Sequence, residues 1–359
     1  MMALPSIGTP VSFFYQLFST QLLADSPLSS LNTTDRYALC LQQDALYLHS
    51  DHQLNLPRGD RFETATQSPV AVLRMFAEHL SWAAVKAVLL KLGIDTALDC
   101  RLYRPHPALA GAVELALPQV LTQDTQQALS ETALQAGCEL VYLQARPSLS
   151  EPGVLVMDMD STAIQIECID EIAALAGVGE QVAAVTARAM NGELDFAQSL
   201  IARVAALQGA PESILQQVLA SIPLMPGLIE LVAYLQQQHW KVAIASGGFT
   251  FFTDALKQRL NLTATYANVL EIQDGKLTGK VSGNIVDATT KAEVVQLLAQ
   301  QHAISLQQTV AIGDGANDIP MLQAAALGVA FHAKPKVQAQ AKAAIRQGSL
   351  LQLLYLLDK

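Results

Sequence analysis

The sequence predicts an α/β protein in which a doubly wound parallel sheet follows a smaller α+β domain. Short apolar runs rich in Val and Ile recur in the second half of the chain, and helical patterns separate them. These runs are Val154–Met157, Val242–Ala245, Thr309–Ile312 and Gly328–Phe331. Continuous runs with β-branched residues are typical of strands that a parallel sheet buries on both faces.

Residues 1–149 are expected to form a separate α+β domain. Apolar patterns predict strands at 37–42, 45–49, 98–103, 112–117 and 139–144, and helices at 69–92 and 123–136. This order contains the β-α-β-β-α-β arrangement of ferredoxin-like (ACT-like) domains. Such a domain can hold a regulatory ligand or join two subunits into a homodimer, and the sequence leaves both roles open.

A linker rich in Pro and Ser, at 146–153, separates this domain from the domain at 150–359. The stretch from Asp170 to about Ser221 shows only helical patterns. Because it lies between the first two apolar runs, it predicts a helical cap inserted at about 168–224. Asp274-Gly275 lies between two strand-like segments and predicts a small hairpin.

Composition narrows the range of functions. The chain of 359 residues is 51% hydrophobic and 15% charged, which is enough apolar material for two domains. Its net charge of -10 argues against a nucleic-acid partner, which a basic face would bind. An acidic protein can still bind an anionic substrate where a metal ion and a few cations reverse the local field.

Two further features favour a cytoplasmic protein with no membrane partner. The four cysteines are widely spaced and form no CxxC pair, as expected for reduced thiols. The apolar stretch Val11–Ala24 has no Lys or Arg before Arg36 and is too short to span a membrane. We expect this stretch to be a docked amphipathic helix.

Polar residues follow the first two apolar runs directly. Asp158 and Asp160 are two residues apart, so both can face one site beyond the strand, although Asp also caps helices well. Ser246-Gly247-Gly248 ends the second run. A hydroxyl with open backbone N–H groups suits phosphate binding, and a plain glycine turn is the alternative interpretation.

Two more segments complete the set. Lys291 lies near the start of a helical pattern, where a solvated surface lysine is the ordinary interpretation. The segment Gly313-Asp314-Gly315-Ala316-Asn317-Asp318 follows the third run. Two acids and a carboxamide in a glycine-rich turn suit a hard cation and its waters, or else they begin a capped helix.

Together these four segments resemble the motifs of the haloacid dehalogenase superfamily, with Asp-x-Asp-x-Thr at 158–162 and Gly-Asp-x-x-x-Asp at 313–318. Other segments narrow the resemblance to its phosphoserine phosphatase family, over about Gly153 to Lys359. These are Glu167 to Glu171, Asn191 to Phe196, Ser199 with Arg203, Ala245 to Phe249, and Phe331 to Pro335. The first 150 residues or so lie outside the resemblance.

The resemblance implies a role for each motif residue. Asp158 attacks phosphorus to form an aspartyl-phosphate, and Asp160 protonates the leaving oxygen and later activates water. Mg²⁺ is the implied cofactor, held by the carboxylates of Asp158 and Asp314 and the backbone carbonyl of Asp160. Asp318 is expected to orient a metal-bound water, and Thr162 is expected to be a supporting residue of the site. Contacts to the substrate are expected from Ser246, the Gly247 N–H, Lys291 and Asn317.

Substrate selection is expected to come from the cap. The resemblance implies that Glu167 binds the ammonium group of an amino acid and that Arg203 binds its carboxylate. Met190 and Phe196 correspond to apolar residues that help to close the site. A surface ion pair and simple core packing are the alternative interpretations. His332 lies near the site and is given no role.

The resemblance therefore implies hydrolysis of O-phospho-L-serine to L-serine and phosphate, the last step of serine biosynthesis. The alternatives are another small amino-phosphate such as phosphohomoserine or phosphoethanolamine, or phosphoryl transfer to an acceptor alcohol. A non-catalytic amino-acid sensor is a third alternative. The presence of a nucleophile, an acid and a metal ligand argues against it.

Overall fold

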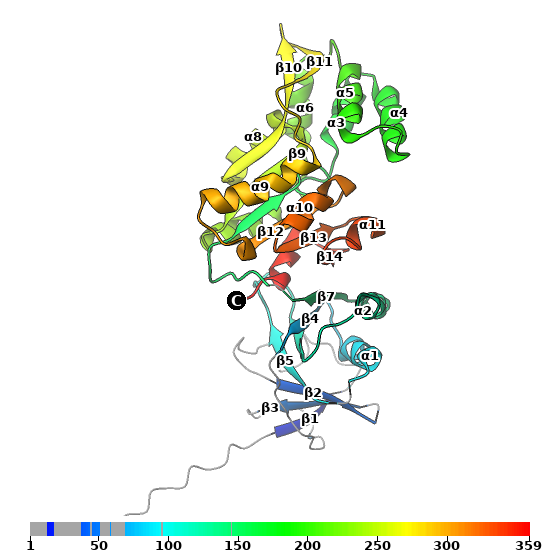
Figure 1. The fold of residues 1–359 in the computed structure, drawn as a ribbon, viewed down its shortest axis with the longest axis vertical. Coiled ribbons are helices and arrows are strands. Elements are labelled where there is room, and N and C mark those ends of the chain that lie inside the picture. Colours follow the sequence, from blue (N-terminus) through cyan, green and yellow to red (C-terminus); the bar gives the residue numbers. More distant parts are fainter. Residues whose placement is uncertain are drawn as a thin grey trace, which may run out of the picture. The chain divides into compact units, whose positions relative to one another are not determined.

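The computed structural model describes residues 13–17, 37–43, 45–50, 58, 69–94, 96–144 and 146–359. Contacts divide the chain into two compact units, Met1–Gln144 and Ala145–Lys359. Each unit contains a seven-stranded sheet with helices packed beside it (Figure 1).

The sheet of the second unit is parallel except for one edge strand. Its order is β11-β10-β9-β8-β12-β13-β14, with only β11 antiparallel to its neighbour. The strands are β8 (Val154–Met157), β9 (Lys241–Phe249), β10 (Ala264–Gln273), β11 (Lys276–Ser282), β12 (Thr309–Gly313), β13 (Leu327–Phe331) and β14 (Ala343–Ile345). The four predicted strands and the predicted hairpin β10–β11 are confirmed. The short strand β14 is an addition.

Helices flank this sheet, and a helical insertion follows its central strand (Figure 1). The flanking helices are α7 (Leu228–Gln237), α8 (Thr250–Leu260), α9 (Ala288–Gln301), α10 (Ile319–Ala324) and α11 (Pro335–Gln338). The insertion contains α3 (Cys168–Leu175), α4 (Gly179–Met190), α5 (Phe196–Ala206) and α6 (Ser213–Ser221). All four residues of β8 are fully buried between β9 and β12. The residues that follow β8 therefore lie at the centre of the sheet's carboxyl edge, where α/β proteins bind ligands.

The hairpin ties the insertion to the sheet through backbone hydrogen bonds. Gly209 N–H donates to the Leu277 carbonyl (2.8 Å), and Leu277 N–H donates back to the Ala210 carbonyl (2.9 Å). Glu212 N–H donates to the Gly275 carbonyl at the hairpin turn (2.9 Å). The segment after α5 is therefore held on the tip of β10–β11.

The first unit has an antiparallel sheet in the order β1-β3-β2-β5-β6-β4-β7. Its elements are β1 (Phe13–Leu17), β2 (Tyr37–Gln42), β3 (Ala45–Ser50), β4 (Ala71–Phe76), α1 (Trp82–Leu92), β5 (Leu98–Tyr103), β6 (Ala112–Leu117), α2 (Gln123–Gln135) and β7 (Glu139–Leu143). The run from β4 to β7 has the ferredoxin-like order of elements. The predicted fold class, a haloacid dehalogenase-type core with an ACT-like domain before it, is confirmed.

Two element predictions in this unit are wrong. Residues 71–76 form β4, although a helix was expected over 69–92. All six residues of β4 are buried between β6 and β7, and periodicity alone cannot distinguish such a continuous apolar run from a buried helix. Phe13–Leu17 forms β1 rather than a helix, because it pairs with β3 along its whole length. The rest of Val11–Ala24 lies outside the described residues.

Among the helices that the structure describes, none has the length and apolar character needed to cross a membrane.

Candidate active site

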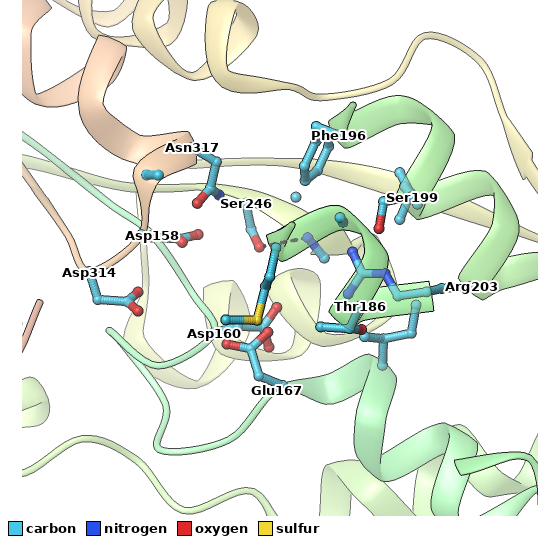
Figure 2. A pocket seen from close by; sticks show the side chains of 18 of the residues that line it. Asp158, Asp160, Glu167, Thr186, Phe196, Ser199, Arg203, Ser246, Asp314 and Asn317 are labelled. Carbon is cyan, nitrogen blue, oxygen red and sulfur yellow. Dashed lines mark hydrogen bonds between the residues drawn. The ribbon is translucent and has the colours of Figure 1, made fainter. Parts of the chain in front are cut away.

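A cavity of about 590 Å³ lies between the helical insertion and the carboxyl edge of the parallel sheet (Figure 2). Most of the predicted site residues line it. They are Asp158, Asp160, Glu167, Met190, Phe196, Arg203, Ser246, Gly247, Asp314 and Asn317. The remaining three, Thr162, Lys291 and Asp318, are almost completely buried. Thr162 bonds to the Asp314 carboxylate, and Lys291 joins the carboxylates of Asp158 and Asp318. The sequence prediction therefore brought together residues from five separate segments.

Asp158 lies immediately after β8 and presents one free oxygen to the cavity. Its Oδ1 accepts a hydrogen bond from its neighbour's backbone, Met159 N–H (2.7 Å), and pairs with Lys291 Nζ (2.8 Å). No described residue donates to its Oδ2. Burial and the nearby Asp318 carboxylate raise the pKa of Asp158 well above its usual value, against the opposing effect of Lys291.

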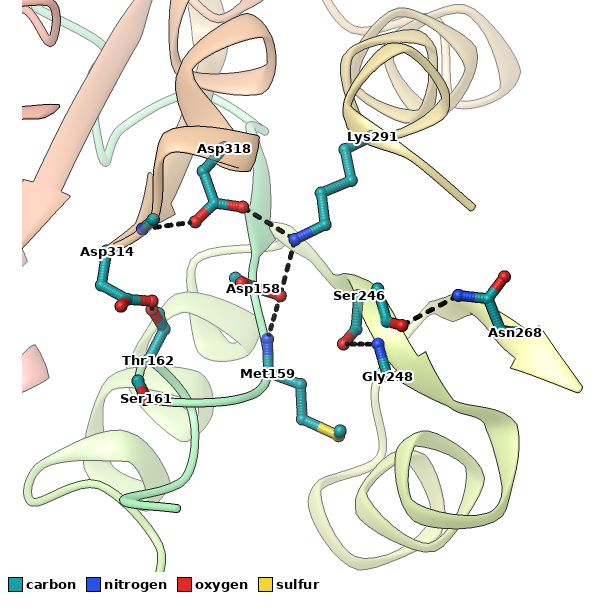
Figure 3. A network of polar contacts seen from close by, with 12 residues as sticks. Asp158, Met159, Ser161, Thr162, Ser246, Gly248, Asn268, Lys291, Asp314 and Asp318 are labelled. Atoms are coloured by element: carbon teal, nitrogen blue, oxygen red, sulfur yellow. Dashed lines mark hydrogen bonds and ion pairs between the residues drawn. The ribbon is translucent and has the colours of Figure 1, made fainter. Parts of the chain in front are cut away.

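Lys291, from the first turn of α9, is 1% exposed and joins two carboxylates (Figure 3). Its Nζ lies 2.7 Å from Asp318 Oδ1 as well as 2.8 Å from Asp158. Burial disfavours the charge on Lys291, but the two carboxylates outweigh this cost and raise its pKa. The other Asp318 oxygen accepts from Gly315 N–H (2.9 Å), so Asp318 also anchors the glycine-rich turn.

The acidic cluster fits a hard divalent cation. Asp158, Asp314 and Asp318 each place a carboxylate oxygen within 4.8 Å of the others. Three carboxylates against the single ammonium of Lys291 leave an excess of two negative charges. Burial, reinforced by Asp318, raises the pKa of Asp314 to about 6, as expected where this charge is not neutralised. Thr162 Oγ1 donates to Asp314 Oδ1 (3.1 Å) and orients that carboxylate.

Asp160 lies between the start of α3 and the glycine pair of β9. Its Oδ1 accepts from Cys168 N–H at the start of α3 (3.0 Å). Its Oδ2 lies so close to Gly248 that a β-carbon there would be only 2.7 Å away. Burial and repulsion by Glu167 raise the pKa of Asp160 to about 7. A carboxyl group with such a pKa can donate and accept a proton near neutral pH.

The end of β9 provides a polar concave surface. Ser246 is 1% exposed, and its Oγ accepts from Gly248 N–H (2.9 Å). Gly247 faces the insertion, where a β-carbon would lie 2.6 Å from the Phe196 ring. A larger residue at this position would therefore displace the Phe196 side chain.

Helix α5 presents the residues that face this surface. A capping box between Asp195 and Gln198 begins the helix. Phe196, Ser199 and Arg203 then share one face, at i, i+3 and i+7, and all three line the cavity. The Arg203 Nε is buried and has no hydrogen-bond partner in the described structure. The Glu167 carboxylate, which accepts from Ser161 Oγ (2.7 Å), lines the same cavity.

Sequence reasoning missed several residues at this site. Thr186 from α4 and Lys336 from α11 line the cavity and were not predicted. His332 and Lys334 also line it; their segment, Phe331 to Pro335, was noted in the sequence, but neither residue was given a role. The loop gave a signal, since it follows a predicted strand as the motif segments do. Asn268 gave none. It is buried on β10 and donates to the Gly247 carbonyl, a contact that depends on the pairing of β10 with β9.

Comparison with known proteins identifies the family of this chain. A family model for haloacid dehalogenase-like hydrolases matches residues 153–326. The chain is 60% identical over 222 residues to a phosphoserine phosphatase of Vibrio cholerae, a match that covers 61% of this chain and 67% of that protein. A phosphoserine phosphatase of Haemophilus influenzae is 58% identical over 220 residues, or 61% and 70% of the two chains. This chain belongs to the phosphoserine phosphatase family.

Solved structures agree with this assignment. A probable phosphoserine phosphatase from Vibrio cholerae, in unliganded form, has a TM-score of 0.66 at 47% identity and covers 80% of this chain and 86% of that one. A substrate-bound phosphoserine phosphatase has a TM-score of 0.55 at 38% identity, over 58% of this chain and 99% of its own. The protein is thus a phosphatase of the haloacid dehalogenase type.

Proposed function

We propose that the protein hydrolyses O-phospho-L-serine to L-serine and phosphate through a phosphoryl group carried by Asp158, completing serine biosynthesis. One observation supports phosphoserine as the substrate. The buried Arg203 Nε lacks a partner, and it lies in the cavity that Asp158 and Asp160 also line. A substrate with both a phosphate and a carboxylate can satisfy these groups together.

In the first step, Asp158 Oδ2 attacks phosphorus, and the bond between phosphorus and the serine oxygen breaks. Asp160, protonated in part because its pKa is about 7, donates a proton to that oxygen, so serine leaves neutral at its hydroxyl. In the second step, Asp160 takes a proton from water as the water oxygen attacks phosphorus. Phosphate leaves and the Asp158 carboxylate is restored.

Mg²⁺ is the proposed cofactor. Its protein ligands would be the carboxylates of Asp158 and Asp314 and the backbone carbonyl of Asp160, with Asp318 orienting a bound water and Thr162 supporting Asp314. The excess negative charge of the cluster and its hard oxygen donors support this assignment. A bound Mg²⁺ supplies positive charge that offsets the repulsion between a carboxylate and the substrate phosphate.

The negative charge that develops on the phosphoryl oxygens must be stabilised by hydrogen-bond donors. We assign this role to the Ser246 hydroxyl, the Gly247 N–H and Lys291, with a further contact from Asn317, which also lines the cavity. Lys291 is fixed by two ion pairs, so it needs no reorganisation when charge develops.

The cap residues are assigned to the amino-acid part of the substrate. Arg203 would pair with the substrate carboxylate and Glu167 with its ammonium group. Phe196, in close contact with Gly247, and Met190, at the cavity wall, would exclude water during the reaction.

The domain organisation is part of the proposal. Residues 1–149 and 150–359 are assigned as separate domains with the cap at about 168–224, and a contact division near residue 144 supports this assignment. The ferredoxin-like sheet is assigned as a homodimer contact on fold analogy. We assign the enzyme to the cytoplasm.

The substrate assignment is tested by a phosphate-release panel with phosphoserine, phosphothreonine, phosphohomoserine, phosphoethanolamine and a sugar phosphate. We expect phosphoserine to lead. Arg203→Ala should lower its kcat/KM about 10- to 100-fold, the usual worth of a hydrogen-bonded charge pair, and leave phosphoethanolamine nearly unchanged.

Arg188→Ala is the matched control, because Arg188 is also on the cap but is more than half exposed and pairs with Glu193. It should leave every substrate unaffected. An equal loss on all substrates in Arg203→Ala would overturn the carboxylate assignment, and preference for an acceptor alcohol over water would favour a phosphotransferase.

A further inference from the structure

Asn268 is a buried polar residue that does not line the cavity but supports its wall. Its side chain is 1% exposed. It lies on β10 where the register with β9 shifts, between Tyr266 and Asn268. At this irregularity β9 carries the segment from Ser246 to Phe249, which lines the cavity. Figure 3 shows Ser246, Gly248 and Asn268 of this region.

Both polar atoms of the Asn268 side-chain amide form hydrogen bonds. Its Nδ2 donates to the Gly247 carbonyl (2.9 Å), and its Oδ1 accepts from Val286 N–H (2.8 Å). The orientation of the amide is fixed, since only the NH₂ end can bond a carbonyl and only the oxygen can accept from Val286. Asn268 therefore connects the Gly247 carbonyl rigidly to a second backbone segment.

Holding that carbonyl also orients the Ser246 hydroxyl. In a trans peptide the C=O and N–H lie in one plane and point in opposite directions. With the Gly247 carbonyl held by Asn268, the N–H of the same peptide, that of Gly248, points to Ser246 Oγ at 2.9 Å. The hydroxyl accepts this bond, and in the described structure no protein group accepts its own proton. Its O–H is left to donate into the cavity.

The two glycines make an external restraint necessary. A β-carbon at Gly247 would lie 2.6 Å from the Phe196 ring, and one at Gly248 would lie 2.7 Å from Asp160 Oδ2, so a larger residue at either position would displace a side chain of the site. Glycine pairs are the most permissive backbone in a protein, so this peptide could rotate unless another group held it. Among the described residues, Asn268 is the side chain that bonds the Gly247 carbonyl.

We propose that Asn268 is a positioning residue for phosphoryl transfer, acting by fixing the Gly247–Gly248 peptide so that the Ser246 hydroxyl is a hydrogen-bond donor to the phosphoryl group. This inference rests on the proposed function. Asn268 touches neither the substrate nor the reacting atoms, and its effect passes through Ser246.

The test is a double-mutant cycle of Asn268→Asp with Ser246→Ala. Asn268→Asp keeps an acceptor for Val286 N–H but places a carboxylate oxygen against the Gly247 carbonyl. We expect kcat/KM for phosphoserine to fall about 10- to 100-fold. Losses of this size are typical when a residue that orients an active-site group through a hydrogen bond is removed. In the Ser246→Ala background the same change should cost less than about threefold, because the group through which it acts is absent.

Thr265→Ala is the matched control. Thr265 is on the same strand and makes its own side-chain hydrogen bond, to Asp254 (3.0 Å), away from the cavity. It should retain wild-type kcat/KM. Asn268→Ser, which is neutral and smaller, replaces Asn268→Asp in the cycle should the buried carboxylate prevent folding.

Additive losses in the cycle would mean that Asn268 supports only the fold, and wild-type activity in Asn268→Asp would also overturn the proposal. The cycle is repeated for inorganic phosphate binding by calorimetry, where the same non-additivity is expected. Absence of phosphoserine hydrolysis by the wild type would refute the proposed function instead, and the phosphate-binding cycle would then decide the inference about Asn268.

Discussion

Removing the charge of Lys291 should destabilise the protein in a pH-dependent way. Lys291→Met keeps the length of the side chain but leaves Asp158 and Asp318 without the ammonium that lies 2.8 and 2.7 Å from them. Breaking a buried ion pair on one side costs about 3–5 kcal/mol, because a buried charge loses its partner. At about 2–4 °C per kcal/mol for a domain of this size, Tm should fall by about 6–20 °C.

The direction of the pH effect follows from the two carboxylates. Burial and Asp318 already raise the pKa of Asp158, and loss of Lys291 must raise it further. Between the pKa of Asp158 in the unfolded chain and its raised pKa in the folded variant, the folded state holds a proton that the unfolded chain has released. Because the folded state binds more protons, the free energy of unfolding increases as pH falls toward about 5. The defect of Lys291→Met should therefore be larger at pH 8 than at pH 5.5.

The measurement is thermal unfolding followed by circular dichroism in EDTA, so that no divalent cation replaces the missing charge. Lys257→Met, at an exposed position on α8, is the control and should stay within about 0.5 kcal/mol of wild type. An equal loss of stability at both pH values, or none at either, would refute the explanation based on a buried carboxylate pair.

Two other predictions concern the metal and the cap. Affinity for Mg²⁺, measured by calorimetry, should fall at least about tenfold per pH unit below pH 6, because protons compete for Asp314, whose pKa is raised to about 6, and for Asp158, whose pKa is also raised. A flat profile would contradict the assignment of these two carboxylates as ligands. Gly247→Ala should lower kcat/KM at least about tenfold, since a β-carbon would lie 2.6 Å from the Phe196 ring. Phe196→Ala should restore part of that loss, and strictly additive effects would show that the steric contact is not the cause.

Much of the site could be predicted because its chemistry lies at strand ends. Asp158, Ser246 and Asp314 each follow an apolar run, and the carboxyl ends of parallel strands meet at one edge of the sheet. The types of side chain then indicated phosphate chemistry. Local sequence was sufficient for these positions because the topology alone brings them together.

Other features depend on contacts that a sequence pattern does not contain. β4 was mistaken for part of a helix because burial on both faces removes the alternation that marks a strand. Lys291 resembled a surface residue, and only the packing of α9 against the sheet places it between two carboxylates. Asn268 became visible only through the pairing of β10 with β9.

The central claim is that Asp158 carries the phosphoryl group, and acid quenching during turnover of phosphoserine labelled in its phosphate tests it most directly. We predict that peptide mass spectrometry will find one phosphoryl group on Asp158, and that Asp158→Asn will give neither label nor phosphate release. Label on another residue, or more than trace turnover in Asp158→Asn, would contradict the account.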